Sequence, residues 1–182
     1  GILVNRISPV NLPGGEIDGV EIAFQHYFRN LPKPFNGLGI IANYAYQDGS
    51  RDQTFSSPAA ISSDGSRQEL PLNFVGLSES SYNFTAFYEK PKWSARLRYT
   101  YRDVFLVSEA TDISNGLPLY TDDRGQLNAS MSYKLNDTVA LTLSGVNLLK
   151  DRTIQPAVFP DGPIARMKDA DRRITIGLRA NL

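Results

Sequence analysis

The chain has 182 residues, no cysteine, and 19 basic against 19 acidic residues, so its formal net charge is zero. The lack of cysteine excludes disulfides, thiol catalysis and Cys-ligated zinc or iron–sulfur sites. Neither sign of charge forms a long run, which argues against a nucleic-acid partner. No stretch reaches the roughly 20 apolar residues of a membrane-spanning helix. Because the chain opens with GILVNRISPVN, without Met or a signal peptide, we expect an internal piece of a longer protein or a mature form.

Seven segments alternate apolar and polar residues with a period of two, which predicts extended β-strands. They span 18–28, 38–48, 81–90, 93–104, 125–134, 139–147 and 172–182. The pattern is clearest in WSARLRYTYR (93–102), where Trp93, Leu97 and Tyr99 share one parity and three arginines share the other. All 11 prolines lie between the segments, as strands that need every backbone N–H require. The sequence therefore predicts an all-β protein with an antiparallel, up-and-down arrangement of about seven strands.

The connections between these segments alternate in length. Those at 29–37, 90–92 and 135–138 are short, whereas those at about 49–79, 105–123 and 148–171 are long and rich in polar residues, Gly and Pro. One edge of the sheet should thus carry short turns and the other large loops. Outer-membrane barrels show this asymmetry, with short periplasmic turns and long extracellular loops.

Aromatic residues on the apolar parity fall into two groups. Near the short-turn edge are Phe28, Tyr88, Trp93 and Tyr133, and toward the other edge are Tyr44, Tyr46, Tyr82, Tyr99 and Tyr101. Amphipathic rings prefer the two membrane–water interfaces, so paired belts are typical of a surface that faces lipid. Charged residues occur on this parity only at strand ends. We therefore expect the apolar face to point outward at lipid and the arginines to point into a barrel.

Three stretches resemble one family. SPVNLPGGEIDGVEIAFQ (8–25) is similar to the Pro-Val-Asn, Gly, Gly-Val-Glu strand of TonB-dependent outer-membrane transporters. LTLSGVNLLKDRT (141–153) resembles the family's penultimate strand with its Asn-Leu pair, and RRITIGLRANL (172–182) resembles the closing strand. The spacing of SYNFTAFYEK and WSARLRYTYR is similar to that of the oligosaccharide-importing branch. One departure is Leu182, where such chains usually end in an aromatic residue.

The resemblance implies a plug domain inside a barrel of about 22 strands. Residues 1–182 would then be the C-terminal part of that barrel, without the plug or the segment that contacts TonB. The implied function is active uptake of an oligosaccharide, an iron–siderophore complex or cobalamin, energised through TonB. The implied location is the bacterial outer membrane, and the implied partners are outer-membrane lipid, the plug, TonB and the ligand. No enzymatic activity and no cofactor are expected.

Two sets of residues are candidates for contacts inside and above the barrel. The first is a set of lumen-facing guanidinium groups that could meet plug carboxylates or an anionic or hydroxylated substrate: Arg96, Arg98, Arg102, Arg173 and Arg179. The alternative is that they only make the barrel wall polar. The second is a set of loop residues that could contact the ligand, and the aromatic ones among them could stack on sugar rings. The alternative is that the aromatic residues pack the loops together. The set is Phe55, Tyr120, Asp122, Asp123 and Phe159.

The sequence gives little support for a metal-binding or catalytic site. The pairs Asp122–Asp123 and Asp169–Asp171 could bind a hard cation such as calcium, but neither has a recognisable ligand-loop spacing, which favours solvated turn residues. The lone His26 is better interpreted as an interfacial residue than as a ligand or base. No nucleophile elbow, phosphate-binding loop or paired-His motif is present.

Two alternatives remain open at this point. A secreted, carbohydrate-binding β-sandwich would bury the apolar parity between two sheets and expose the arginines. A passive, porin-like barrel would share the lipid-facing surface but would have no plug and no energy coupling. Seven barrel strands would also leave two open edges, so we expect this segment alone not to fold stably in water.

Overall fold

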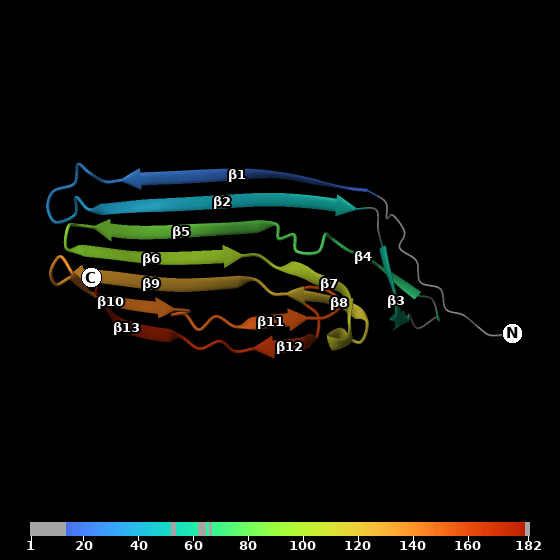
Figure 1. Ribbon diagram of the computed structural model, residues 1–182. Helices are drawn as coiled ribbons and strands as arrows, with labels where there is room; N and C mark the ends of the chain where they lie inside the picture. Colours follow the sequence, from blue (N-terminus) through green and yellow to red (C-terminus); the bar gives the residue numbers. More distant parts are fainter. Residues whose placement is uncertain (1–13, 52–53, 62–64, 66, 181–182) are drawn as a thin grey trace.

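The computed structural model describes residues 14–51, 54–61, 65 and 67–180, with the backbone alone for 54–61 and 67–71. Its main feature is one seven-stranded antiparallel sheet in which strands follow each other in chain order (Figure 1). The strands are β1 (Gly15–Tyr27), β2 (Leu38–Arg51), β5 (Ser80–Glu89), β6 (Trp93–Arg102), β9 (Arg124–Lys134), β10 (Val139–Val146) and β13 (Arg173–Ala180). The predicted strands and their up-and-down order are confirmed. Within the described residues the sheet does not close, since β1 pairs only with β2 and β13 only with β10.

One face of this sheet is apolar from edge to edge. The register places Ala86 opposite Leu97 and Leu143 opposite Ile176, so the apolar parity of each strand joins that of its neighbours. Leu97, Leu141 and Ile176 are 46%, 38% and 73% exposed, and no second layer covers them within the described chain. This excludes the β-sandwich alternative, in which those three side chains would pack together between two sheets.

The aromatic rings pair across strands at the two ends of this face. Trp93 lies opposite Tyr133 with ring centroids 4.4 Å apart near the short turns, and Tyr82 lies opposite Tyr101 with centroids 4.8 Å apart toward the other end. On β1 the ring of His26 lies beside Phe24 and Phe28. The register thus arranges the aromatic residues as the sequence predicted.

The long connections contain three β-hairpins that the alternation pattern missed. They are β3 (Thr54–Ile61) with β4 (Arg67–Pro71), β7 (Phe105–Thr111) with β8 (Leu117–Thr121), and β11 (Thr153–Pro156) with β12 (Ile164–Lys168). All three lie at the end of the sheet opposite the short turns (Figure 1). Each has a register shift, which interrupts the period of two and explains why the pattern was not visible in the sequence.

The β7–β8 hairpin and the end of β11 contain the most deeply buried side chains for which burial is described. Leu106 and Pro118 are less than 2% exposed, and Leu119 bridges to Ala157, so β7, β8 and β11 share one small core. A 3₁₀ turn, η1 (Asp112–Ser114), joins β7 to β8. No helix in the described residues is long and apolar enough to cross a membrane.

One aromatic side chain is buried on the polar face. Phe87 is only 8% exposed, and its ring lies over Gly39 on β2 with the Tyr27 ring 6.0 Å away. A Cβ on Gly39 would come within 2.2 Å of the Phe87 ring, so the glycine makes room for it. This contact accounts for the exception that Phe87 makes to the alternation.

Asn147 organises the chain where β10 ends. Its side-chain amide donates to the carbonyl oxygens of Asp151 and Ala170 at 3.2 and 2.7 Å, and its Oδ1 accepts from the Asp151 N–H at 2.8 Å. The residue is 4% exposed and has a left-handed backbone with φ of 54°. The Asn-Leu pair noted in the sequence is therefore a structural hub that ties the end of β10 to the segment before β13.

Candidate functional site

The five candidate arginines lie on the same face of the sheet. The register pairs Arg96 with Ser130, Ser130 with Ser144 and Ser144 with Thr175, which joins the polar parity of β6 to that of β13. Arg173 and Arg179 are on this parity of β13, and Arg98 and Arg102 are on that of β6. The opposite face is the apolar one, so the sheet separates hydrogen-bond donors from hydrocarbon-like side chains.

A hollow with both polar and apolar lining residues lies at the centre of the polar face, between β2 and β10. Its lining includes Asn43, Asn83, Arg96, Arg98 and Asn128. Within it the Arg98 Nη2 and the Thr100 hydroxyl donate to Asn83 Oδ1 at 3.2 and 3.0 Å. The Arg98 guanidinium remains exposed and retains further donors, so the hollow offers a positively charged hydrogen-bonding surface.

The remaining arginines of β6 are engaged in different ways. Arg96 forms an ion pair with Glu89 at 2.9 Å near the short-turn end, where both side chains are largely exposed. Arg102 turns toward the segment before β5, where its Nε donates to the Ser78 hydroxyl at 2.7 Å and its Nη2 donates to the Gly76 carbonyl. The Arg102 guanidinium also lies 3.8 Å from the centroid of the Phe105 ring. Arg102 thus links the segment before β5 and the start of β7 to the main sheet. The alternation of polar and apolar residues alone does not reveal this role.

Most of the candidate loop residues lie around the shared core of the hairpins. Tyr120 is on β8 and half-buried, and the Asp122 N–H after this strand donates to the Ile154 carbonyl of β11. Phe159 follows Val158, whose N–H donates to the Pro118 carbonyl, and its side chain is 51% exposed. Asp123 is exposed at the start of β9. The structure therefore brings β8 and the turn after β11 together.

Phe55 is the one loop candidate whose side chain falls outside the described part of the structure. Its backbone lies on β3, opposite Leu70 on β4. The strand β3 contacts β8, so this hairpin adjoins the strand that carries Tyr120.

A charged pair between β2 and β7 was not foreseen from the sequence. Arg51 Nη1 and Glu109 Oε1 are 2.7 Å apart, and the Arg51 side chain is 9% exposed. Arg51 Nε also donates to the Leu72 carbonyl at 2.9 Å, and the guanidinium lies over Phe74. Burial raises the pKa of the nearby Tyr120 hydroxyl, and the charge of Arg51 acts in the opposite direction. No sequence signal links residues 51 and 109, because they belong to different loops.

The candidate cation-binding carboxylates are paired with basic side chains or lie apart. Asp169 is 3.0 Å from Arg152, and Asp171 is 3.7 Å from Lys150. The described residues contain no group of three or more His, Asp or Glu side chains placed to hold a metal ion.

Comparisons with known proteins assign the family. The family described as TonB dependent receptor-like, beta-barrel matches residues 3–148. The crystal structure of the siderophore receptor PiuA from Acinetobacter baumannii is similar in fold, with a TM-score of 0.57 and 15% sequence identity over 91% of this chain and 22% of that one. The chain thus spans about a fifth of the length of that receptor. No curated protein sequence matches. Together with the antiparallel sheet and its apolar outer face, the family match shows that this chain belongs to the TonB-dependent receptor β-barrel family of the bacterial outer membrane.

Proposed function

We propose that residues 1–182 form the C-terminal wall of a larger receptor barrel that encloses a plug domain. Two unpaired edges, at β1 and β13 of the described sheet, support this interpretation because an exposed sheet edge requires a pairing strand. Coverage of only 22% of a solved receptor chain is consistent with a sheet that is one part of a larger barrel.

The proposed activity is uptake of a scarce nutrient across the outer membrane, energised through TonB acting on the plug. The observation that carries the proposal is the family match over residues 3–148. The substrate is an oligosaccharide, an iron–siderophore complex or cobalamin. The siderophore receptor shares 15% identity with this chain, which supports the fold and leaves these three classes open. This segment contributes wall, lumen surface and external loops, and catalyses no reaction.

Energy coupling is testable in cells that express the full-length protein. We expect uptake of a labelled substrate to stop when TonB is deleted or when a protonophore collapses the inner-membrane gradient. A passive barrel is the alternative, and it would predict uptake that continues unchanged under both conditions. The amount of folded receptor in the outer membrane serves as the control in each case.

We propose that hydrogen-bond donors on the polar face bind the plug or the substrate. Arg98 and Arg96 border the central hollow, so charge-assisted hydrogen bonds from them to a carboxylate or a hydroxylated ligand would each contribute roughly 1.5–3 kcal/mol. We therefore expect the double variant R96Q/R98Q to lower the rate of uptake by about tenfold or more.

The matched control is R166Q, which removes an exposed arginine of β12 outside the candidate set. Both receptors should reach the same level in the outer membrane. If R96Q/R98Q transported at the rate of the unmodified receptor, these arginines would serve only to keep the wall polar.

A further inference from the structure

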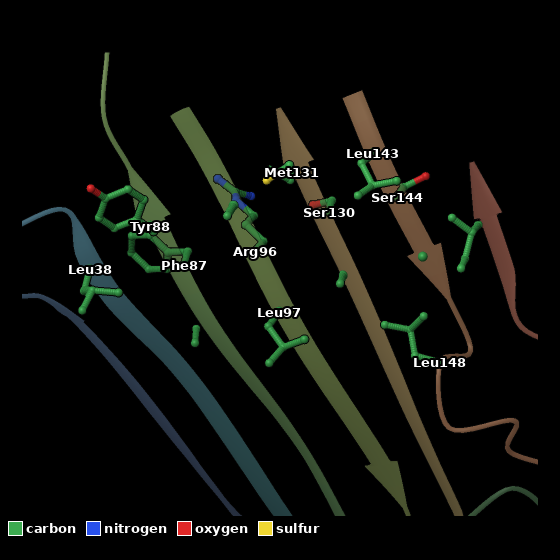
Figure 2. A pocket seen from close by; sticks show the side chains of 15 residues that line it. Leu38, Phe87, Tyr88, Arg96, Leu97, Ser130, Met131, Leu143, Ser144 and Leu148 are labelled. Atoms are coloured by element: carbon green, nitrogen blue, oxygen red, sulfur yellow. The ribbon is translucent and has the colours of Figure 1, made fainter. Parts of the chain in front are cut away.

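The apolar face contains a hollow near its short-turn end (Figure 2). It arises where short side chains on β5, β6 and β9 lie among long ones on β6, β9 and β10. Its floor and walls include Ala86, Ala95, Ala129, Leu97, Met131 and Leu143. In Figure 2 the labelled side chain of Leu97 on β6 lies between Leu38 on β2 and Leu148, which follows β10. The exposed surface of the hollow is almost wholly apolar, which suits a hydrocarbon chain.

A basic cluster lies just beyond this hollow, at the turn between β5 and β6. It consists of Lys90 and Lys92, which border a second, smaller hollow beside Trp93. Lys134 also borders this smaller hollow, but it lies on the polar parity of β9 with Ser130 and Ser132 and is not part of the cluster. Lys90 is on the apolar parity of β5 and donates to Asn36 Oδ1, and an ammonium group has three donors, so it can bind a further acceptor. Lys92 is exposed in the turn.

Two carboxylates lie close to the basic cluster and must be weighed against it. Glu89 borders the smaller hollow but forms an ion pair with Arg96 at 2.9 Å. Asp137 is exposed in the next turn. Lys90 and Lys92 together outweigh Asp137 and leave a net positive charge at this rim, because Glu89 is neutralised by an arginine.

The pair Trp93–Tyr133 lies between the lysines and the apolar hollow. Trp93 is two residues from Ala95 on β6, which corresponds to about 7 Å along a strand. From the short turns inward, the order is thus cationic groups, amphipathic aromatic rings and an apolar hollow. A phospholipid has the same order of parts, with phosphate, glycerol ester and acyl chain.

We propose that this surface binds one phospholipid of the leaflet at the short-turn end, the periplasmic side in barrels of this kind. One acyl chain occupies the apolar hollow, and the phosphate contacts Lys90 and Lys92. The charge of the rim selects the phosphate group, and the apolar hollow fixes the acyl chain at one position. This site is distinct from the polar face and does not depend on the transported substrate.

The test measures retention of phosphatidylglycerol by the full-length protein in detergent, using native mass spectrometry over a lipid titration. The unmodified protein should retain one lipid more tightly than any others. K90Q/K92Q should weaken this binding by about tenfold or more, since each lysine contributes on the order of fivefold. A129L fills the hollow and should abolish the tight site.

Two controls isolate the site from general lipid contact. K168Q removes an exposed lysine of β12 at the hairpin end, and A42L adds the same side chain to the apolar face of β2 outside the hollow. Both should bind lipid as the unmodified protein does. Equal loss of binding in the controls would overturn the proposal. Unchanged binding in K90Q/K92Q would also overturn it, and so would unchanged binding in a folded A129L. The measurement uses neither substrate nor TonB, so its outcome is independent of the transport proposal.

Discussion

Replacing Leu97 by arginine is expected to shift the folding equilibrium in lipid bilayers strongly toward the unfolded protein. Leu97 lies in the middle of β6 on the apolar face and is 46% exposed. An arginine on the lipid face near the bilayer midplane costs about 2–4 kcal/mol. This corresponds to a 30- to 900-fold shift in the folding equilibrium. The measurement is the folded fraction of the full-length protein in phospholipid vesicles, determined by the heat-dependent shift in electrophoretic mobility.

The matched control for L97R is S144R, which introduces the same charge on the polar face of β10. Ser144 lies one register row from the Leu97–Ala129 pair, so the two substitutions are at nearly equal depth. S144R should insert like the unmodified protein because its guanidinium enters a hydrated lumen. Equal losses for both variants would mean that the two faces do not differ in environment.

Replacing Asn147 by alanine is also expected to have a large effect, lowering the free energy of unfolding by about 2–5 kcal/mol. The substitution leaves the carbonyl oxygens of Asp151 and Ala170 without the donor that reaches them now. A lost partner for a buried polar group costs about 1–3 kcal/mol. A left-handed backbone adds about 1–2 kcal/mol for alanine. Denaturant titration of the vesicle-folded protein measures the change.

Asn115 provides the control that separates these two costs. It also has a left-handed backbone, with φ of 53°, but it is exposed at the end of η1. N115A should therefore lose only the conformational part, about 1–2 kcal/mol. If N147A were no more destabilising than N115A, the hydrogen bonds of Asn147 would contribute nothing to stability.

The main sheet was predictable because each of its strands has one environment on each side. WSARLRYTYR shows this most clearly, since Trp93 and Leu97 share the apolar face while Arg96 and Arg98 share the polar one. The hairpins at the other end have no such division. Leu106 and Pro118 are buried among neighbouring loops, so hydrophobicity there follows local packing and has no period of two.

The side-chain contacts of the candidate site were less predictable from the sequence than the division of the sheet into a polar and an apolar face. Parity places Arg102 on the same face as Arg98, but it does not show that the guanidinium turns to Ser78 and Phe105. The pairing of Arg51 with Glu109 likewise joins β2 and β7, which are far apart in the sequence. Such contacts depend on how the hairpins fold back on the sheet, and this geometry is not encoded in the alternation of a single strand.

The most direct test of the lipid-outward orientation is cysteine accessibility along β6. The chain has no cysteine, so single replacements at positions 95 to 99 can each be labelled separately where the rest of the protein also lacks accessible thiols. In the vesicle-folded, full-length protein, a water-soluble maleimide should label positions 96 and 98, and a bilayer-restricted quencher should reach probes at 95, 97 and 99. Uniform labelling by the water-soluble reagent, or labelling of positions 95, 97 and 99 in place of 96 and 98, would contradict the lipid-outward orientation.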